Sequence, residues 1–71
     1  MTNPNVVRAA RLLYIRDLLT QKPRTATELA QLCEVSRDTI YRDLISLQLE
    51  PLCVALYAEQ DRWRILNLDV A

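Results

Sequence analysis

The 71-residue sequence contains no histidine and no glycine, and each absence excludes a class of site. Without histidine, the chain lacks the most common general base and the usual nitrogen ligand of zinc. Without glycine, it lacks the glycine-rich loop that brings a phosphate group close to the backbone. An enzyme is therefore the least favoured class of function, and we expect no metal and no other cofactor.

Cysteine is scarce as well, with Cys33 and Cys53 as the only two. They are too far apart for a CxxC motif, and with no histidine they cannot complete a zinc ligand set. We interpret both as small buried hydrophobic residues. A disulfide between them is the less favoured alternative, because lone cysteines in a reducing compartment usually stay reduced.

Long apolar runs are also missing, since no segment approaches the roughly 20 apolar residues of a membrane helix. The N-terminus lacks the charged-then-apolar layout of a secretory signal, so we expect a soluble, cytoplasmic protein without membrane contact. The 51% of apolar side chains predict one small domain over residues 1–71. A core of this size rarely supplies more than ~3–5 kcal/mol, which would leave a monomer marginally stable.

The sequence also lacks an excess of charge of either sign, because nine basic side chains balance nine acidic ones. A nucleic-acid-binding protein is expected to be basic, so the neutral total argues against that class. The charges are unevenly distributed, however. Residues 1–48 hold seven basic and five acidic side chains, and residues 49–71 hold two and four. The N-terminal two thirds therefore carry a modest positive balance of +2.

Helical spacing begins close to the N-terminus. Asn3-Pro4 fits an N-cap followed by proline in the first turn, and Pro23 ends the segment, which predicts a helix over 4–21. One apolar stripe of this helix is expected to face the core; it consists of Leu12, Ile15, Leu18 and Leu19. A second apolar line lies on the opposite side; it consists of Val6, Ala10 and Leu13. We favour a dimer contact for this line over scattered exposed apolar residues.

Two further helices are predicted, over 26–33 and 37–49. Thr25 and Glu28 have the spacing of a capping box, and Ser36 is a favourable N-cap for the next segment. In that segment a stripe at helical spacing is expected to be buried; it consists of Ile40, Leu44 and Leu47. Pro51 ends the helical pattern.

Beyond Pro51 the apolar period changes to two, which predicts a two-stranded β-hairpin over 52–67. Trp63 and Ile65 are expected to face the core, with Arg62 and Arg64 outward. The polar connector 58–61 is short enough for a type I turn.

The segment ELAQLCEVSRDTIYRDLISL, residues 28–47, resembles the helix-turn-helix of DeoR-type and biotin-repressor-type winged helix regulators. The family pattern is met by Leu29, Ala30, Val35, Ser36, Thr39, Ile40, Arg42, Asp43 and Leu44. This resemblance implies a mainly α (α+β) winged helix-turn-helix fold and a bacterial or phage transcriptional regulator that binds double-stranded DNA. It also implies that one member of the Arg42-Asp43 pair contacts DNA while the other braces the fold.

With the stripe of the third helix buried, Asp38, Arg42 and Ile45 are expected to point outward. Arg42 is a candidate for guanine or phosphate, Thr39 and Tyr41 for a thymine methyl group or the backbone, and Arg37 for phosphate. Asp38 would accept from cytosine or repel wrong bases. The candidate DNA-binding residues are Ser36, Arg37, Asp38, Thr39, Tyr41, Arg42, Thr27, Arg62 and Arg64. Acidic Glu59 and Asp61 beside the hairpin arginines predict a weak contribution from the wing.

The sequence departs from the family pattern at Glu34, which stands where many members carry the turn glycine. That position is often left-handed, and a residue other than glycine then costs roughly 1–2 kcal/mol. Glycines usual in the wing are replaced as well, by Gln60-Asp61.

The favoured hypothesis is a sequence-specific regulator that acts as a homodimer through the first helix, with no small-molecule effector evident. Two half-sites would multiply the few base contacts that one helix makes. The alternative is a winged-helix module for protein interaction that has lost DNA binding, favoured by the neutral charge and by apolar residues outside the expected core; these are Leu32, Ile45 and Leu49.

Overall fold

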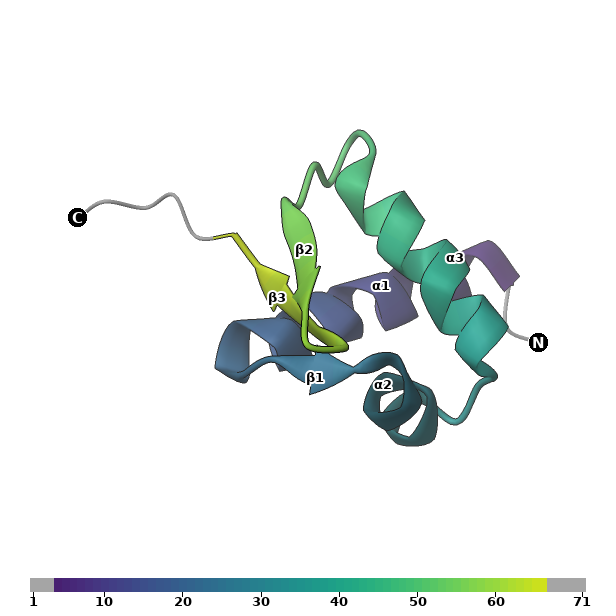
Figure 1. The fold of residues 1–71 in the computed structure, drawn as a ribbon. Helices are drawn as coiled ribbons and strands as arrows, with labels where there is room; N and C mark the ends of the chain where they lie inside the picture. The colour runs from purple at the N-terminus through teal and green to yellow at the C-terminus, as the bar shows by residue number, and fades with distance from the viewer. Residues whose placement is uncertain (1–3, 67–71) are drawn as a thin grey trace.

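The computed structural model describes the backbone of residues 4–66 and the side chains of residues 7–66. Figure 1 shows three helices followed by a β-hairpin. The elements are α1 (Pro4–Gln21), β1 (Arg24–Thr25), α2 (Ala26–Cys33), α3 (Arg37–Gln48), β2 (Leu56–Glu59) and β3 (Arg62–Ile65). The predicted winged helix-turn-helix fold is confirmed, and β1 adds a third strand to the expected hairpin.

The side-chain hydroxyl groups of Thr25 and Ser36 cap the N-termini of α2 and α3. Thr25 Oγ1 accepts a hydrogen bond from the backbone N–H of Glu28, and the Glu28 carboxylate accepts one from the N–H of Thr25, each at 3.0 Å. Ser36 Oγ accepts from the N–H of Thr39 at 3.2 Å. These bonds satisfy donors that the first helical turn leaves unpaired, so both helices begin at fixed residues. α3 ends at Gln48 rather than at 49, because Leu49 adopts an extended conformation (φ −95°, ψ 164°).

The core lies where the three helices meet, and each helix contributes three residues. They are Ile15, Leu18 and Leu19 from α1, Ala26, Leu29 and Ala30 from α2, and Ile40, Leu44 and Leu47 from α3. In Figure 1, α3 lies in front of α1 and above α2, and it contacts both. Burial of a leucine or isoleucine contributes about 1.5–3 kcal/mol, so this cluster fixes the orientation of α3.

The sheet has the order β1-β3-β2, and both pairs are antiparallel. Trp63 pairs with Arg24 of β1 on one side and with Ala58 of β2 on the other. Trp63 and Ile65 pack against the core, as predicted, while Arg62 lies exposed on the opposite face. β1 was not predicted because two residues are too few to show a strand period. Thr25 both ends this strand and caps α2, which ties the wing to the helix-turn-helix.

Two predictions about the wing are wrong. β2 begins at Leu56 rather than near Leu52, because the preceding backbone bonds to the end of α3: Cys53 N–H donates to Leu49 O at 2.9 Å, and Val54 N–H to Leu47 O at 2.7 Å. The hairpin turn is not type I over four residues. It is the pair Gln60 (φ 53°) and Asp61 (φ 66°), and positive φ at both positions is the signature of a two-residue type I′ turn.

The cysteine prediction holds only in part. Both thiols are free, and Cys33 is half-buried against the core. Cys53, by contrast, is exposed, so its interpretation as a buried hydrophobic residue is wrong. It has φ 48° and lies in the segment that bonds to the end of α3, which turns its side chain to the surface.

Candidate nucleic-acid interface

The turn between α2 and α3 fixes how α3 projects from the domain. Glu34 follows α2 in the left-handed conformation (φ 58°, ψ 44°), as its place in the motif predicts. The next N–H, that of Val35, donates to Ala30 O at 3.0 Å, which closes the end of α2. Two residues later Ser36 starts α3. The turn between α2 and α3 therefore takes only the three residues 34–36, and α3 begins at the exposed Arg37.

Ser36 caps the N-terminus of α3, and its hydroxyl also contacts Thr39 in the first turn. Besides accepting from the N–H of Thr39, Ser36 Oγ lies 3.0 Å from Thr39 Oγ1, and one hydroxyl donates to the other. One O–H of this pair remains free to donate to an outside acceptor. Ser36 and Thr39, both predicted DNA contacts, thus stabilise the N-terminus of α3. One hydroxyl donor of the pair remains available at this end of the helix.

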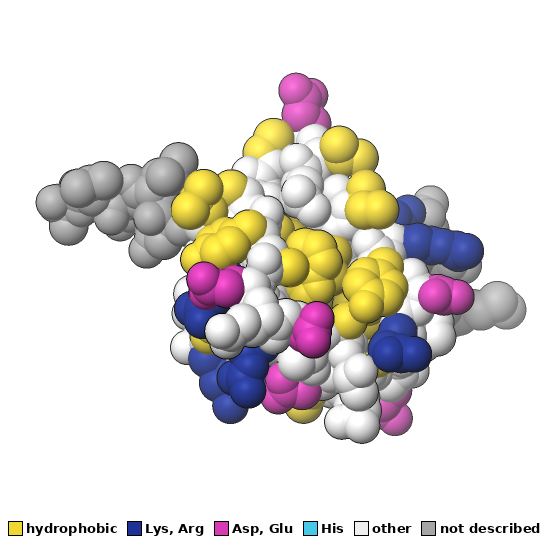
Figure 2. All heavy atoms as spheres, viewed as in Figure 1, with side chains coloured by type: hydrophobic (Ala, Val, Ile, Leu, Met, Phe, Trp, Pro, Cys, Tyr) yellow, Lys and Arg dark blue, Asp and Glu magenta, His cyan; other side chains and the backbone are white. Residues whose placement is uncertain are grey.

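The outward face of α3 carries Asp38, Arg42 and Ile45, all exposed as predicted. We call these three residues the crest of α3. Ile45 has 59% of its surface exposed, although it has no polar atom in its side chain. Figure 2 shows hydrophobic side chains gathered over α3 and the neighbouring hairpin, with charged groups around them. The crest therefore combines two charges of opposite sign with one large apolar group.

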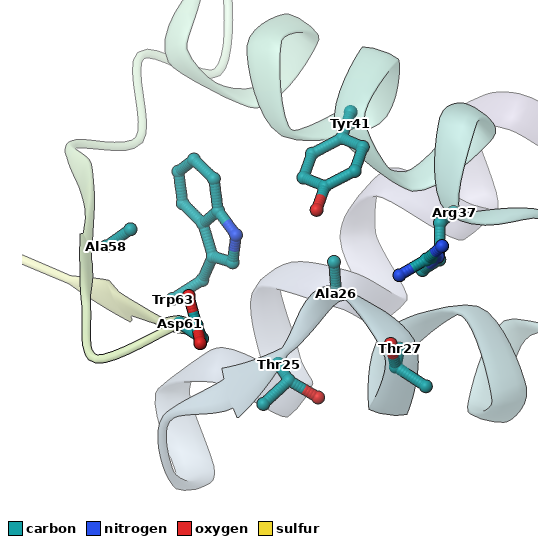
Figure 3. A pocket seen from close by; sticks show the side chains of 8 residues that line it. All are labelled: Thr25, Ala26, Thr27, Arg37, Tyr41, Ala58, Asp61 and Trp63. Atoms are coloured by element: carbon teal, nitrogen blue, oxygen red, sulfur yellow. The ribbon is translucent and has the colours of Figure 1, made fainter.

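On the wing side of α3 lies a cleft of about 510 Å³, shown in Figure 3. It is lined by Thr25, Ala26, Thr27, Arg37, Tyr41, Ala58, Asp61 and Trp63. The rings of Tyr41 and Trp63 lie on opposite sides of it, the Tyr41 hydroxyl points toward the start of α2, and Arg37 and Thr27 stand at its far end. The structure thus brings together three predicted residues, Thr27, Arg37 and Tyr41, all of which offer hydrogen-bond donors. Asp61 adds a negative charge at the wing end.

On the other side of α3, a smaller hollow of about 270 Å³ is lined by Arg8, Arg11, Thr39, Arg42 and Asp43. Asp43 is 1% exposed and is held by Arg11, whose Nη2 donates to Oδ1 at 3.0 Å and whose Nε donates to Oδ2. The hydrogen bond to Asp43 raises the pKa of Arg11. Asp43 is therefore the member of the Arg42-Asp43 pair that braces the fold, and Arg42 is the one that faces outward.

Arg8 is a residue of this hollow that sequence reasoning missed. Its Nη2 donates to Ser46 Oγ, and its Nε lies 3.8 Å from Asp43 Oδ1. Arg8, Arg11 and Arg42 line this hollow with Asp43 as its one carboxylate, so the hollow keeps a positive balance. The only signal in the sequence was the spacing of Arg8 and Arg11, which places both on one side of a helix. Nothing local to α1 indicated that this side meets α3.

The described part of the chain thus presents one exposed helix with a donor-rich hollow on each side. Residues 11–62 match the model of a family described as HTH domain. The chain belongs to the HTH domain family. No curated protein and no solved structure matches it. The matched residues run from α1 into β3, so they include the turn at Glu34 and all of α3, and this HTH domain is a DNA-binding helix-turn-helix domain with a wing.

The wing of this HTH domain offers little free positive charge. Arg64 Nε lies 3.2 Å from Glu59 Oε1, an ion pair by distance although the groups are not aligned for a hydrogen bond. Arg62 is exposed and stands opposite Glu59 in the strand register. Both predicted wing arginines therefore have an acidic side chain beside them, and the weak contribution expected from the wing stays a prediction.

A third surface hollow of this HTH domain lies between α1 and the end of α2, has a volume of about 500 Å³ and is mainly apolar. It is lined by Val7, Ala10, Arg11, Tyr14, Leu32, Cys33, Glu34 and Val35. Of the apolar line predicted on α1, Ala10 and Leu13 are exposed, while the side chain of Val6 lies outside the described residues. The exposed apolar surface of α1 thus continues onto α2 through Leu32.

Among residues 4–66, no group of side chains could hold a metal ion, and none of the helices described there is long and apolar enough to cross a membrane. Cys33, the thiol nearest the Arg11–Asp43 pair, has a raised pKa because burial disfavours its charged form. A thiol of this kind is less reactive than an ordinary one.

Proposed function

We propose that this HTH domain is a sequence-specific, double-stranded-DNA-binding transcriptional regulator of the cytoplasm that inserts α3 into the major groove. The observation that carries the proposal is the arrangement of donors around α3: Thr27, Arg37 and Tyr41 on the wing side, Arg8 and Arg42 on the α1 side. A helix in a major groove has one phosphate backbone on each side, and such contacts fix its register.

The residues have distinct proposed roles. Arg37, Thr27 and the Tyr41 hydroxyl contact one phosphate backbone, and Arg8 contacts the other. Arg42 belongs to the crest and also lines the hollow on the α1 side, so it reaches either a guanine edge or a phosphate. At the tip, the free hydroxyl donor of the Ser36–Thr39 pair and the positive end of the helix dipole favour a further phosphate.

Other residues play a smaller part in the proposal. Asp38 accepts from a cytosine amino group or repels bases that present acceptors. Arg62 and Arg64 make weak contacts with flanking phosphates, because Glu59 and Asp61 stand beside them.

We further propose that the domain acts as a homodimer through α1. Support comes from the apolar surface that Val7 and Tyr14 form with Leu32, and from Leu13, which is also exposed in the single chain. The nine core residues found among the described side chains would leave a monomer marginally stable, and burial of this surface in a second copy would add to its stability. Two copies would also present two recognition helices to two half-sites of an operator.

Selection from a random duplex pool at low salt, followed by titration of the selected duplex at increasing salt, tests the function. The expected result is sequence-selective binding with a logarithmic salt slope set by the number of phosphates contacted. Arg42→Ala should weaken binding strongly. Arg16→Ala, which removes an α1 arginine outside both hollows, should weaken it little. Absence of binding at low salt would refute the proposal.

A protein-interaction module remains the second candidate, and one observation favours it. Tyr41 and Ile45 are both exposed and follow one another at i and i+4 along α3, and the exposed Leu49 comes directly after the helix ends. Such a stripe is typical of a helix that docks on a protein groove. The salt titration separates the candidates, because an apolar contact with a protein survives salt that dissociates a phosphate-dependent complex.

A further inference from the structure

Ile45 stands at the centre of the surface that the proposed function turns toward DNA, with 59% of its surface exposed. A single exposed isoleucine is ordinary on most protein surfaces. Here, however, it lies three residues beyond Arg42, which lines the hollow on the α1 side, and four beyond Tyr41, which lines the cleft on the wing side. Helical spacing therefore places Ile45 on the outward side of α3 between these two residues. When phosphates occupy the donors on the two sides, the residue between them faces the floor of the groove.

The chemistry of the groove determines what such a side chain meets. Base edges in the major groove present hydrogen-bond donors and acceptors, with one apolar exception, the 5-methyl group of thymine. Isoleucine pressed on a G·C edge would strip water from polar atoms and replace none of their hydrogen bonds. On a thymine methyl group it would bury apolar surface on both partners. An apolar group on the crest thus selects one base.

We propose, on the basis of the proposed function, that Ile45 is a specificity-determining residue that packs on the 5-methyl group of a thymine in each half-site. Arg37, which lines the cleft on the wing side, and Arg42 of the crest are complementary to phosphate, so they favour DNA over an apolar protein partner as the occupant of this face. Ile45 lies seven residues beyond Asp38, or about 10 Å along the helix, so its thymine belongs to a different base pair from the one that Asp38 faces.

The test uses the duplex selected by the full chain and replaces its thymines one at a time with deoxyuridine. Deoxyuridine lacks the 5-methyl group and keeps every hydrogen-bonding atom. Burial of one methyl-sized group corresponds to about a fourfold change in affinity, so one position in each half-site should lose about fourfold. Ile45→Ala should lose affinity for the thymine duplex and no longer distinguish deoxyuridine at that position.

Leu49→Ala is the matched control. Leu49 is as exposed as Ile45 and follows it at i+4, but it lies past the last helical residue of α3. This variant should keep the fourfold discrimination. Because both side chains are exposed, neither substitution should impair folding, which circular dichroism checks.

The outcomes separate this inference from the function on which it rests. If the protein selects no duplex, both are refuted, and the apolar stripe is assigned to a protein contact. If it selects a duplex but no deoxyuridine substitution changes affinity, the DNA-binding function stands and the role of Ile45 is refuted. The same conclusion follows if Ile45→Ala retains the full discrimination.

Discussion

Arg11 of α1 and Asp43 of α3 form a two-pronged ion pair in which the carboxylate is almost completely buried. The pair joins α1 to the middle of α3, close to Ile40 and Leu44 of the core. Orientation of α3 therefore depends on one charged contact as well as on apolar packing.

Arg11→Ala should destabilise the domain by about 3–5 kcal/mol, because it leaves the Asp43 carboxylate buried without its partner. The double variant Arg11→Met, Asp43→Leu should recover most of this loss, since neither charge is then buried. Urea unfolding followed by circular dichroism measures both. A loss below about 1 kcal/mol in the single variant would show that the pair contributes no more than an exposed one.

Arg8→Ala should separate binding from stability. Arg8 is half exposed and lies 3.8 Å from Asp43, so its loss should cost no more than about 1 kcal/mol of stability. If it contacts a phosphate, the logarithmic salt slope of DNA binding should fall by about 1. Arg16→Ala is the control and should leave the slope unchanged. An unchanged slope in Arg8→Ala would remove α1 from the interface.

Glu28 should make stability depend on pH. The pKa of Glu28 is below its ordinary value of 4.5, mainly because the Thr25 N–H donates to the carboxylate. A lowered folded-state pKa means that the carboxylate contributes stability above pH 4.5 and loses it as pH falls through the folded value. The urea midpoint of Glu28→Gln should be lower than that of the wild type at pH 7 and should meet it in acid. The difference between Glu28→Gln and Glu28→Ala should not change with pH, and a wild-type advantage that persists in acid would contradict this assignment.

Glu34→Gly should stabilise the domain. The left-handed backbone at Glu34 costs roughly 1–2 kcal/mol of folding free energy, whereas glycine costs about 0.5–1 kcal/mol in chain entropy. The substitution should therefore raise the free energy of unfolding by about 0.5–1 kcal/mol. Gln31→Gly, at an exposed helical position of α2, should lose about 1 kcal/mol instead. Thermal or urea unfolding measures the two variants side by side. A loss of stability in Glu34→Gly would mean that the Glu34 side chain offsets its own strain.

Local signals predicted most of the fold. The capping box at Thr25, the N-cap at Ser36 and the buried stripe of α3 are short-range patterns, and the structure contains all of them. Long-range contacts could not be predicted, because they produce no periodic pattern in the sequence. Examples are the pairing of Arg24 with Trp63 and the hydrogen bonds from residues 53 and 54 to the end of α3.

In the candidate site, too, local patterns were predicted from the sequence and long-range contacts were not. Exposure of Arg37, Asp38 and Arg42 followed from the helical period of α3. The meeting of Arg8 and Arg11 with Asp43 depended on the packing of α1 against α3, which no spacing along the chain encodes. In the Arg42-Asp43 pair, the motif named two residues, and only the packing assigned Asp43 to the fold.

Dimethyl sulfate footprinting of the selected duplex is the most direct measurement, because this reagent methylates guanine N7 in the major groove and adenine N3 in the minor groove. The proposed insertion of α3 predicts protection of guanine N7 within each half-site, at positions that Arg42→Ala exposes again. A stable complex in which every guanine N7 stays reactive while adenine N3 is protected would contradict it.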